Sequence, residues 1–548
     1  MRPARSIASV LAAMMAAATA AHAAEPIVDF VVQRSDTLIG LSNSVLVSSA
    51  AWREVAQLNR LPNPNRIRPG QVLRIPERLM RSAAAPARLV SVAGDVRVDD
   101  AAAAAGGALG EGQSVQTGAG GSVVIELADG SRLRLPPSSL VQVAASRTYA
   151  SRPSEPGAAG ASGGWFAGSM RLLRGSVEVF ATKVLRAKPL EIVTPTAVVG
   201  VRGTEFRVGF DEAANGRGRS EVIEGAVRFE LLRGNAGADL ATGFGAAADA
   251  AGAPPQVARL LAAPDLSALP DRFERPLVRF QVAAEPSALR VQVASDDAFD
   301  KVISDQVIAA GSEVRIAGLA DAQWYLRARR IDTQGLEGFD AKRAFVLKAR
   351  PEPPAYRTPR SGAKQAVGSV EFAWAPNANA PQVQLQVAED AAFTRLVQNR
   401  DGLSATTLRT DIAAAGTYYW RLASVRGDGD HGPFGDPQPF ELRPTPEPPR
   451  GGASADGSAL MFTWSGRAQD RQQVELARDA AFAGIVARDE LAASEWTLPR
   501  PASGGRYYFR YRSVEPDGYV SPYSETLQVD LPRDWSPLWL LLPLLLVL

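Results

Sequence analysis

The second half of the sequence repeats itself three times, and the length of the repeat limits the fold that this half can adopt. One shared block reads LRVQVASDDAFDKVI, VQLQVAEDAAFTRLV and QVELARDAAFAGIV, and it places Phe299, Phe393 and Phe482 at intervals of 94 and 89 residues. A second block places Arg327, Arg421 and Arg510 at the same two intervals. Alternating apolar and polar residues indicate strands, and roughly 100 residues is the size of one β-sandwich. We therefore expect three tandem sandwiches, over residues 271–350, 355–443 and 448–532.

Two further features favour separate sandwiches joined by stiff linkers. The sequence PEPP begins at Pro351 and again at Pro446, and proline-rich segments act as semi-rigid spacers. Aromatic residues alternate around the shared arginines, which predicts core positions rather than a ligand platform for Tyr418, Trp420, Tyr507 and Phe509. The pattern resembles fibronectin type III domains.

Composition excludes several classes of site. The 548 residues include no cysteine and two histidines, His22 and His431. Disulfides, thiolate nucleophiles, iron–sulfur clusters and the usual cysteine–histidine zinc sites are therefore excluded. We expect no metal and no other cofactor, and His431, in what reads as a loop tip, has no partner at a catalytic spacing.

The N-terminus has the pattern of an exported protein. Arg2 and Arg5 precede an alanine-rich apolar run, which ends in the small-residue sequence AHAAEP. This order is typical of a cleaved secretory signal peptide, here residues 1–24. Its removal takes 2 of the 60 basic residues and none of the 58 acidic ones, so the remaining chain has a net charge of zero. A basic surface for nucleic acid is not expected.

The C-terminal segment, residues 535–548, reads WSPLWLLLPLLLVL. A membrane-spanning helix needs about 20 apolar residues, and the uninterrupted run from 538 to 548 has 11. Trp535 and Trp539 suit the interfacial zone of a bilayer, so we expect a membrane tether. The alternative is a terminus that is buried against protein.

Residues 28–76 predict a small βααβ unit. A short strand at 30–33 precedes a helix that Ser35 or Asp36 can cap. A second helix at 50–58 has Trp52, Val55 and Leu58 on one face, and a turn cluster leads to a closing strand at 71–75.

This unit resembles a LysM domain over its full length. The signature positions present are Asp36, Thr37, Leu38, Asn59, Ile67, Pro69, Gly70 and Gln71, whereas Gly40 and Asn43 depart from the usual helix pattern. LysM domains hold N-acetylglucosamine-containing glycans in a shallow groove between two loops. The resemblance therefore implies peptidoglycan as the partner and, as glycan-binding residues, Asp36, Thr37, Leu38, Ile67, Pro69 and Gly70. The alternative for single residues is structural: Asp36 caps the helix and Thr37 packs.

Residues 89–232 predict an all-β domain. Apolar and polar residues alternate at 122–127 and 131–135 around Asp129-Gly130, which is the strongest short-range signal for a hairpin. Similar strand pairs follow as far as 232, with a flexible loop expected at 151–164. The alanine-, proline- and glycine-containing stretches at 82–110 and 233–270 are expected to be linkers.

Three segments of this domain, LADGSRLRL, MRLLRGSVEV and TPTAVVGVRGTEFRV, resemble the FecR domain. FecR regulators carry a cytoplasmic segment and a transmembrane helix ahead of this domain and pass an outer-membrane signal to a sigma factor. A signal peptide occupies that position here, so the resemblance implies a periplasmic β-domain that binds or senses a partner, without a role in transcription.

The last of these segments holds Gly200, Arg202, Gly203, Thr204 and Glu205, which at first resemble a binding loop. A P-loop requires GxxxxGK[ST] before a helix, whereas TEFRVGF alternates like a strand. We expect a structural role instead. The glycines would lie where strands turn or pass closely, and Arg202 and Glu205 would pair with each other or with neighbouring strands.

The sequence as a whole predicts a mainly β, multidomain chain that begins with a small α/β module. Carboxylate pairs such as Asp296-Asp297 and Glu389-Asp390 precede the shared phenylalanines, which favours a shared turn over a catalytic pair. The chain is expected to be a noncatalytic protein of the periplasm or cell envelope, anchored at a membrane, which docks on peptidoglycan and presents its β-domains to another envelope protein. The alternatives are a periplasmic FecR-type sensor and, as a third candidate, a cell-wall hydrolase.

Overall fold

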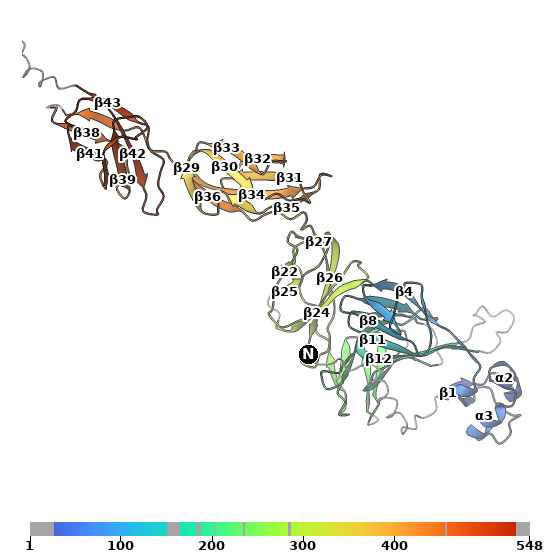
Figure 1. Ribbon diagram of the computed structural model, residues 1–548. Coiled ribbons are helices and arrows are strands. Elements are labelled where there is room, and N and C mark those ends of the chain that lie inside the picture. Colours follow the sequence, from blue (N-terminus) through green and yellow to red (C-terminus); the bar gives the residue numbers. More distant parts are fainter. Residues whose placement is uncertain are drawn as a thin grey trace, which may run out of the picture. The chain divides into compact units, whose positions relative to one another are not determined.

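The computed structural model of the chain describes residues 27–150, 165–183, 188–201, 203–233, 236–282, 286–454 and 457–532 (Figure 1). The predicted signal peptide 1–24, loop 151–164, Arg202 and tail 535–548 lie outside these residues. The chain divides into two compact units, with the boundary after Leu347. Within the described ranges, no helix is both long enough and apolar enough to cross a membrane.

The N-terminal module has the expected βααβ order. It consists of β1 (Ile27–Val31), α2 (Leu38–Ser44), α3 (Trp52–Leu58) and β2 (Val72–Pro76), followed by a 3₁₀ turn at Glu77–Leu79. β1 and β2 pair in antiparallel fashion, with Val31 opposite Val72. The core of the module includes buried Val55 and Leu73.

Two details of this module differ from expectation. Thr37, and not Ser35 or Asp36, caps α2, because its extended backbone lets Oγ1 accept the Gly40 N–H at 3.0 Å. A Cβ at Gly40 would lie 2.9 Å from this oxygen, so the glycine leaves room for the cap. Leu58 is 43% exposed, because it lies about 200° around the helix from buried Ala56.

A single closed sheet follows, and it is larger than predicted (Figure 1). Its strands are β3 (Ser82–Ala84), β4 (Ala87–Ala93), β5 (Val96–Val98), β6 (Ala101–Ala102), β7 (Ala108–Leu109), β8 (Ser114–Thr117), β9 (Ser122–Glu126), β10 (Arg132–Leu135), β11 (Leu140–Tyr149), β12 (Trp165–Phe180), β13 (Leu190–Val193), β14 (Ala197–Val201), β15 (Glu205–Asp211), β16 (Arg217–Glu224), β17 (Ala226–Leu231), β18 (Gly237–Ala241), β19 (Phe244–Ala248) and β20 (Gln256–Arg259). The hairpin at Asp129-Gly130 is confirmed, with β9 paired to β10 and Gly130 at φ +81°.

The stretches predicted as linkers contain strands of this sheet. β3 to β7 lie within residues 82–110, and β18 to β20 lie within 233–270. Both stretches read as linkers because they are rich in alanine and glycine. The structure differs because Ala246 and Ala248 are buried in the core beside larger side chains such as Phe206, so small residues here fill space inside the sheet.

The first sandwich completes the first unit. Its strands are β21 (Arg272–Phe273), β22 (Val278–Phe280), β23 (Ala288–Ala294), β24 (Val302–Ile308), β25 (Val314–Ile316), β26 (Ala322–Ile331) and β27 (Ala341–Leu347). The larger sheet has the order β21-β27-β26-β23-β24, and β22 pairs with β25.

The second unit contains two more sandwiches. The strands of the first are β28 (Tyr356–Thr358), β29 (Ala363–Ala366), β30 (Gly368–Trp374), β31 (Gln382–Ala388), β32 (Leu396–Leu403), β33 (Thr407–Ile412), β34 (Gly416–Val425), β35 (His431–Phe434) and β36 (Gln438–Arg443). Those of the second are β37 (Arg450–Ala453), β38 (Ala459–Thr463), β39 (Arg471–Ala477), β40 (Ile485–Leu491), β41 (Glu495–Pro499), β42 (Gly505–Val514) and β43 (Leu527–Leu531). The orders β32-β31-β34-β36 and β40-β39-β42-β43 match β24-β23-β26-β27 of the first sandwich, so one arrangement occurs three times.

The three copies share a turn, as the sequence predicted. Phe299, Phe393 and Phe482 all have positive φ, at 61°, 59° and 57°. Each donates its backbone N–H to the carbonyl of an aspartate three residues earlier, at 3.1–3.2 Å, and that aspartate side chain accepts further backbone N–H groups in the turn. The pairs of acids therefore belong to a turn that positions the phenylalanine.

The predicted aromatic core positions are also confirmed. Tyr418, Trp420, Tyr507 and Phe509 are all 3% exposed or less. Tyr418 and Tyr507 donate their hydroxyls to the carbonyls four residues upstream, at 3.0 and 2.5 Å, which is the corner bond of a sandwich. His431 begins the short strand β35 rather than sitting in a loop tip, because backbone pairing to Val425 extends the sheet there.

Candidate functional site

The two loops expected to hold glycan lie side by side in the N-terminal module. Val32 donates its backbone N–H to the carbonyl of Gln71, and Gly70 donates its own to the carbonyl of Val32, both at 2.8 Å. Gly70 has φ +82°, a conformation that glycine adopts without strain. These bonds fix the loop after β1 against the loop before β2.

The six predicted glycan-binding residues differ in their accessibility. Thr37, Pro69 and Gly70 are exposed, and Asp36 and Ile67 are partly exposed. Leu38 is 2% exposed and belongs to the core. The structure therefore gives Leu38 a packing role and leaves the other five positions at or near the surface.

Two of these residues also shape the loops. Asp36 accepts the backbone N–H of Gln33 at 2.7 Å, and Thr37 caps α2. Neither bond prevents a ligand contact, because a carboxylate and a hydroxyl can each make more than one hydrogen bond.

The sequence interpretation missed Ile39 and the way in which Asn59 acts. Ile39 follows Thr37 and Leu38 directly and is 53% exposed, so it offers an apolar contact beside the loops. Asn59 donates to the carbonyls of Val55 and Arg74 at 2.8 Å and accepts the Arg74 N–H at 2.7 Å. This amide fastens the end of α3 to β2 and so holds the second loop in place.

The glycine-rich motif of the closed sheet lies at a strand turn. Gly203 has φ +64°, and a Cβ there would lie 2.8 Å from Lys183 Cγ, so a residue without a side chain is required. Gly200 lies in β14, where a Cβ would meet its nearest atom at 3.7 Å, so the expected close approach at Gly200 is wrong. Strand β15 follows the motif directly, which confirms that it is not a P-loop.

The polar residues of this motif have different surroundings. Thr204 is 3% exposed, and a Cβ at Gly225 would lie 2.4 Å from its methyl carbon, so the two residues pack tightly. The backbone of Glu205 pairs with the neighbouring strands β12 and β16. Its side chain is partly buried and makes no hydrogen bond or ion pair with another residue that the structure describes. Burial raises the pKa of its carboxyl, and the charges of Glu178 and Asp340 raise it further.

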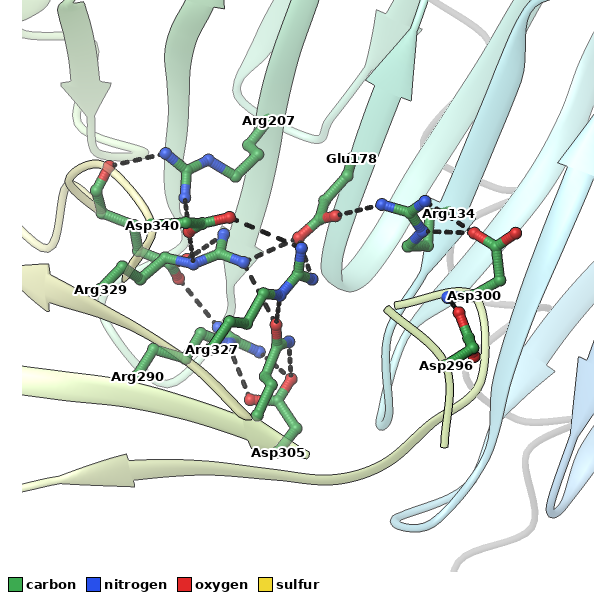
Figure 2. Close-up of polar contacts among 12 residues, drawn as sticks. Arg134, Glu178, Arg207, Arg290, Asp296, Asp300, Asp305, Arg327, Arg329 and Asp340 are labelled. Atoms are coloured by element: carbon green, nitrogen blue, oxygen red, sulfur yellow. Dashed lines mark hydrogen bonds and ion pairs between the residues drawn. The ribbon is translucent and has the colours of Figure 1, made fainter. Parts of the chain in front are cut away.

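A buried cluster of charged residues joins the closed sheet to the first sandwich (Figure 2). Glu178, on β12, accepts from Arg327 Nη2 at 2.5 Å and from Arg329 Nη2 at 2.9 Å, and both arginines lie on β26 of the sandwich. Arg134, on β10, lies 3.2 Å from the second oxygen of Glu178 and also pairs with Asp300 at 2.6 Å. The Glu178 side chain is 7% exposed.

Glu337, which lies between β26 and β27 of the sandwich, is a second carboxylate that pairs with several arginines. Its Oε1 lies 2.5 Å from Arg219 and 2.9 Å from Arg290, and its Oε2 lies 3.1 Å from Arg329. Arg329 also pairs through Nε with Asp340 at 2.9 Å. One guanidinium, 2% exposed, therefore links three carboxylates.

Pairing with arginines favours the ionised form of the two central glutamates, Glu178 and Glu337. Burial alone would raise the pKa of Glu178, but the charges of Arg327, Arg329 and Arg134 outweigh it and hold that pKa well below its usual range. Burial is likewise outweighed at Glu337, where Arg290, Arg219 and Arg329 lower the pKa. Removing one partner of a buried pair typically costs about 3–5 kcal/mol. The cluster therefore fixes the sandwich to the closed sheet.

The shared arginine has an equivalent set of contacts in each copy. Arg421 donates to Gln386 and stacks 4.0 Å from the centre of the Phe393 ring, and Arg510 donates to Glu475 and stacks 3.8 Å from Phe482. In the first copy Arg327 contacts Gln292 and Phe299 in the same way. There the closer carboxylate, 2.5 Å from Arg327, comes from Glu178 of the closed sheet, and Asp340 of the sandwich lies 3.6 Å away.

Comparison with known proteins agrees with two of the sequence resemblances. A LysM domain model matches residues 30–76, and a FecR protein model matches residues 113–228. No curated protein is matched by the whole sequence. Among the residues that the structure describes, no group of three or more His, Cys, Asp or Glu side chains is arranged to hold a metal ion.

Solved structures with similar parts include an anti-sigma factor and fibronectin(III)-like modules. A candidate anti-sigma factor from Parabacteroides distasonis is 16% identical with a TM-score of 0.19, and the match covers 27% of this chain and 58% of that one. The FN1–FN3 domains of chicken CNTN1 are 13% identical with a TM-score of 0.21, over 50% of this chain and 97% of theirs. The fibronectin(III)-like modules of Clostridium thermocellum CbhA are 14% identical with a TM-score of 0.21, over 32% and 93%.

Proposed function

We propose that this chain is an exported, noncatalytic protein of the cell envelope that docks on peptidoglycan through its N-terminal module. The match of residues 30–76 to the LysM domain, whose members bind N-acetylglucosamine glycans, carries the proposal. The closed sheet and the three sandwiches would then present surfaces to a second envelope protein. LysM, FecR and fibronectin-like domains are typically not catalytic, which favours a binding role for the whole chain.

The groove proposed for the glycan lies along the two bonded loops. Thr37, Pro69 and Gly70 would form its edges, Asp36 and Ile67 would support it, and Ile39 would add an apolar contact. Shallow sites of this kind use apolar contact together with a few fixed polar groups. The exposed backbone of Gly70 suits such a site, since its missing side chain leaves the loop open.

Co-sedimentation of the mature chain with purified peptidoglycan tests this proposal. The variant Ile39→Asp places a charge beside the groove, and we expect it to reduce the sedimented fraction. Val47→Asp is the matched control, because Val47 is also an exposed aliphatic residue of the module, 51% accessible, but lies outside the two loops. Equal loss of binding in both variants, or in neither, would contradict the assigned groove.

Export and membrane attachment are tested by two separate experiments. Cleavage after residue 24 predicts a mature chain that begins at Glu25, which N-terminal sequencing of the secreted form would show. Attachment through residues 535–548 predicts that the mature chain enters the membrane fraction, and that a chain ending at 532 does not.

A sensor is the second candidate function, and the FecR match at residues 113–228 favours it. In that case the β-domains would recognise a periplasmic ligand and would change their association with a partner. Crosslinking in cells, with the intact chain and with a chain that lacks the closed sheet, distinguishes the scaffold from the sensor. A scaffold keeps its partners when growth conditions change, whereas a sensor exchanges them.

A further inference from the structure

A cavity of about 440 Å³ lies where the closed sheet meets the first sandwich. Its lining combines apolar side chains, among them Phe180, Ile223 and Phe339, with charged side chains from both domains. This volume lies within the range of sites that hold small organic ligands. The cavity lies within the first unit and is separate from the loops of the LysM-like module.

Two charged residues of the lining lack an ion-pair partner. The carboxylate of Glu205 makes no close ion pair with another described residue, and its pKa is raised by burial and by the charges of Glu178 and Asp340 and lowered by those of Arg207 and Lys342. Lys342 likewise has no described carboxylate partner, and its ammonium lies 5.4 Å from the centre of the Phe299 ring. A carboxylate and an ammonium without close ion-pair partners thus share one cavity, near enough for the charge of Lys342 to act on Glu205.

Arg207 adds positive charge to the same wall. Its side chain is 7% exposed, and its Nη2 donates to the carbonyls of Glu337 and Gly338 at 3.2 and 2.7 Å. Its Nε makes no hydrogen bond within the described part of the chain, and the nearest carboxylate oxygen, on Asp340, is 3.6 Å from Nη1. A buried arginine with incomplete pairing favours a negative group nearby.

We infer that this cavity binds a small zwitterion with an apolar body, such as a short peptide with free termini. The ammonium of the ligand pairs with Glu205, and its carboxylate pairs with Lys342 in the positive potential of Arg207. The apolar body contacts Phe180, Ile223 and Phe339. A ligand ammonium at Glu205 adds a close counter-charge to the partial compensation that Arg207 and Lys342 provide against Glu178 and Asp340. This site is independent of glycan binding.

The dipeptide alanylphenylalanine is a suitable probe, with calorimetry on the mature chain as the measurement. Two blocked analogues remove one charge each: the N-acetyl form lacks the ammonium, and the C-terminal amide lacks the carboxylate. We expect each analogue to bind about tenfold more weakly or worse, because a charge-assisted hydrogen bond is lost. Glu205→Gln should remove the preference for the free ammonium, and Lys342→Met the preference for the free carboxylate.

Matched controls keep the test specific. Glu230→Gln and Lys301→Met remove exposed charges of the same domains away from the cavity lining, and both should bind like the parent chain. Circular dichroism checks that all four variants fold. Equal binding of the dipeptide and both analogues, unchanged preferences in the two cavity variants, or no binding up to about 10 mM would each overturn the inference.

Discussion

Replacement of Glu178 by glutamine should loosen the contact between the closed sheet and the first sandwich. The amide keeps the size of the side chain but removes the charge that faces Arg134, Arg327 and Arg329. These arginines are 12%, 3% and 2% exposed, so water can replace little of the lost pairing. Breaking a buried pair typically costs about 3–5 kcal/mol, and Arg329 retains Glu337 and Asp340, so we expect about 3 kcal/mol.

Hydrogen exchange measured by mass spectrometry is the appropriate assay, because a chain of several domains does not unfold in one two-state step. A loss of about 3 kcal/mol raises the exchange rate of the affected amides roughly 100-fold. We expect this in peptides from β12 and β26, whereas peptides from the second unit, after Leu347, serve as an internal reference.

The matched control is Glu126→Gln. Glu126 pairs with Arg132 in the same sheet, but the two side chains are 34% and 53% exposed, so its loss should cost less than about 1 kcal/mol. Unchanged exchange in β26, or an equal change in the control, would refute the reasoning.

The pH dependence of stability is a second test of the role of Glu178. Because the folded-state pKa of Glu178 is lowered, its contribution is present above the ordinary glutamate pKa and is lost only as the pH falls below it.

Three further predictions concern single positions. The folded-state pKa of Glu205 is raised, so ionised Glu205 opposes folding, and Glu205→Gln should raise the melting temperature at pH 7 but not at pH 4. Gly203→Ala should lower stability by about 1–2 kcal/mol through its positive φ, whereas Gly200→Ala in β14 should be neutral or slightly stabilising in the same melts. Thr37→Val removes the α2 cap and should cost about 1 kcal/mol in denaturant unfolding of the N-terminal module.

Local sequence signals predicted most of the fold correctly. The hairpin at Asp129-Gly130 and the repeated turn before Phe299 depend on neighbours within a few residues, and the backbone conformation there follows from residue type. The closed sheet was predicted too small because alanine and glycine carry no strong strand preference. Their burial at Ala246 depends on partners from distant strands, which local patterns do not reveal.

The same distinction between local and distant determinants applies to the residues of the candidate sites. Thr37, Pro69 and Gly70 lie in loops that are fixed by nearby bonds, and they are exposed at the surface. Leu38 was grouped with them because it belongs to the same motif, but its side chain packs in the core, whereas that of its neighbour Ile39 is exposed. Glu205 was expected to pair with Arg202 or with neighbouring strands, and Arg202 lies outside the described residues. The charges that act on Glu205 come from nearby Arg207 and from Glu178, Asp340 and Lys342, which are distant in the sequence.

Differences between the sequences of the three repeats indicate the charge cluster. Arg327, Arg421 and Arg510 are equivalent, and two residues later the first and third copies have Arg329 and Arg512, where the second has Ala423. Residues two apart on a strand share a face, so the first and third copies each present two arginines on one strand face, of β26 and of β42. In the third copy Arg510 donates to Glu475 and Arg512 to Gln473, both on the neighbouring strand of the same sheet, whereas the first copy has Gln292 and Arg290 at those positions. The neighbouring strand of the first copy therefore offers its arginines no carboxylate, and Glu178 of the closed sheet supplies one. The first sandwich therefore belongs structurally with the closed sheet, although its sequence groups it with the other two copies.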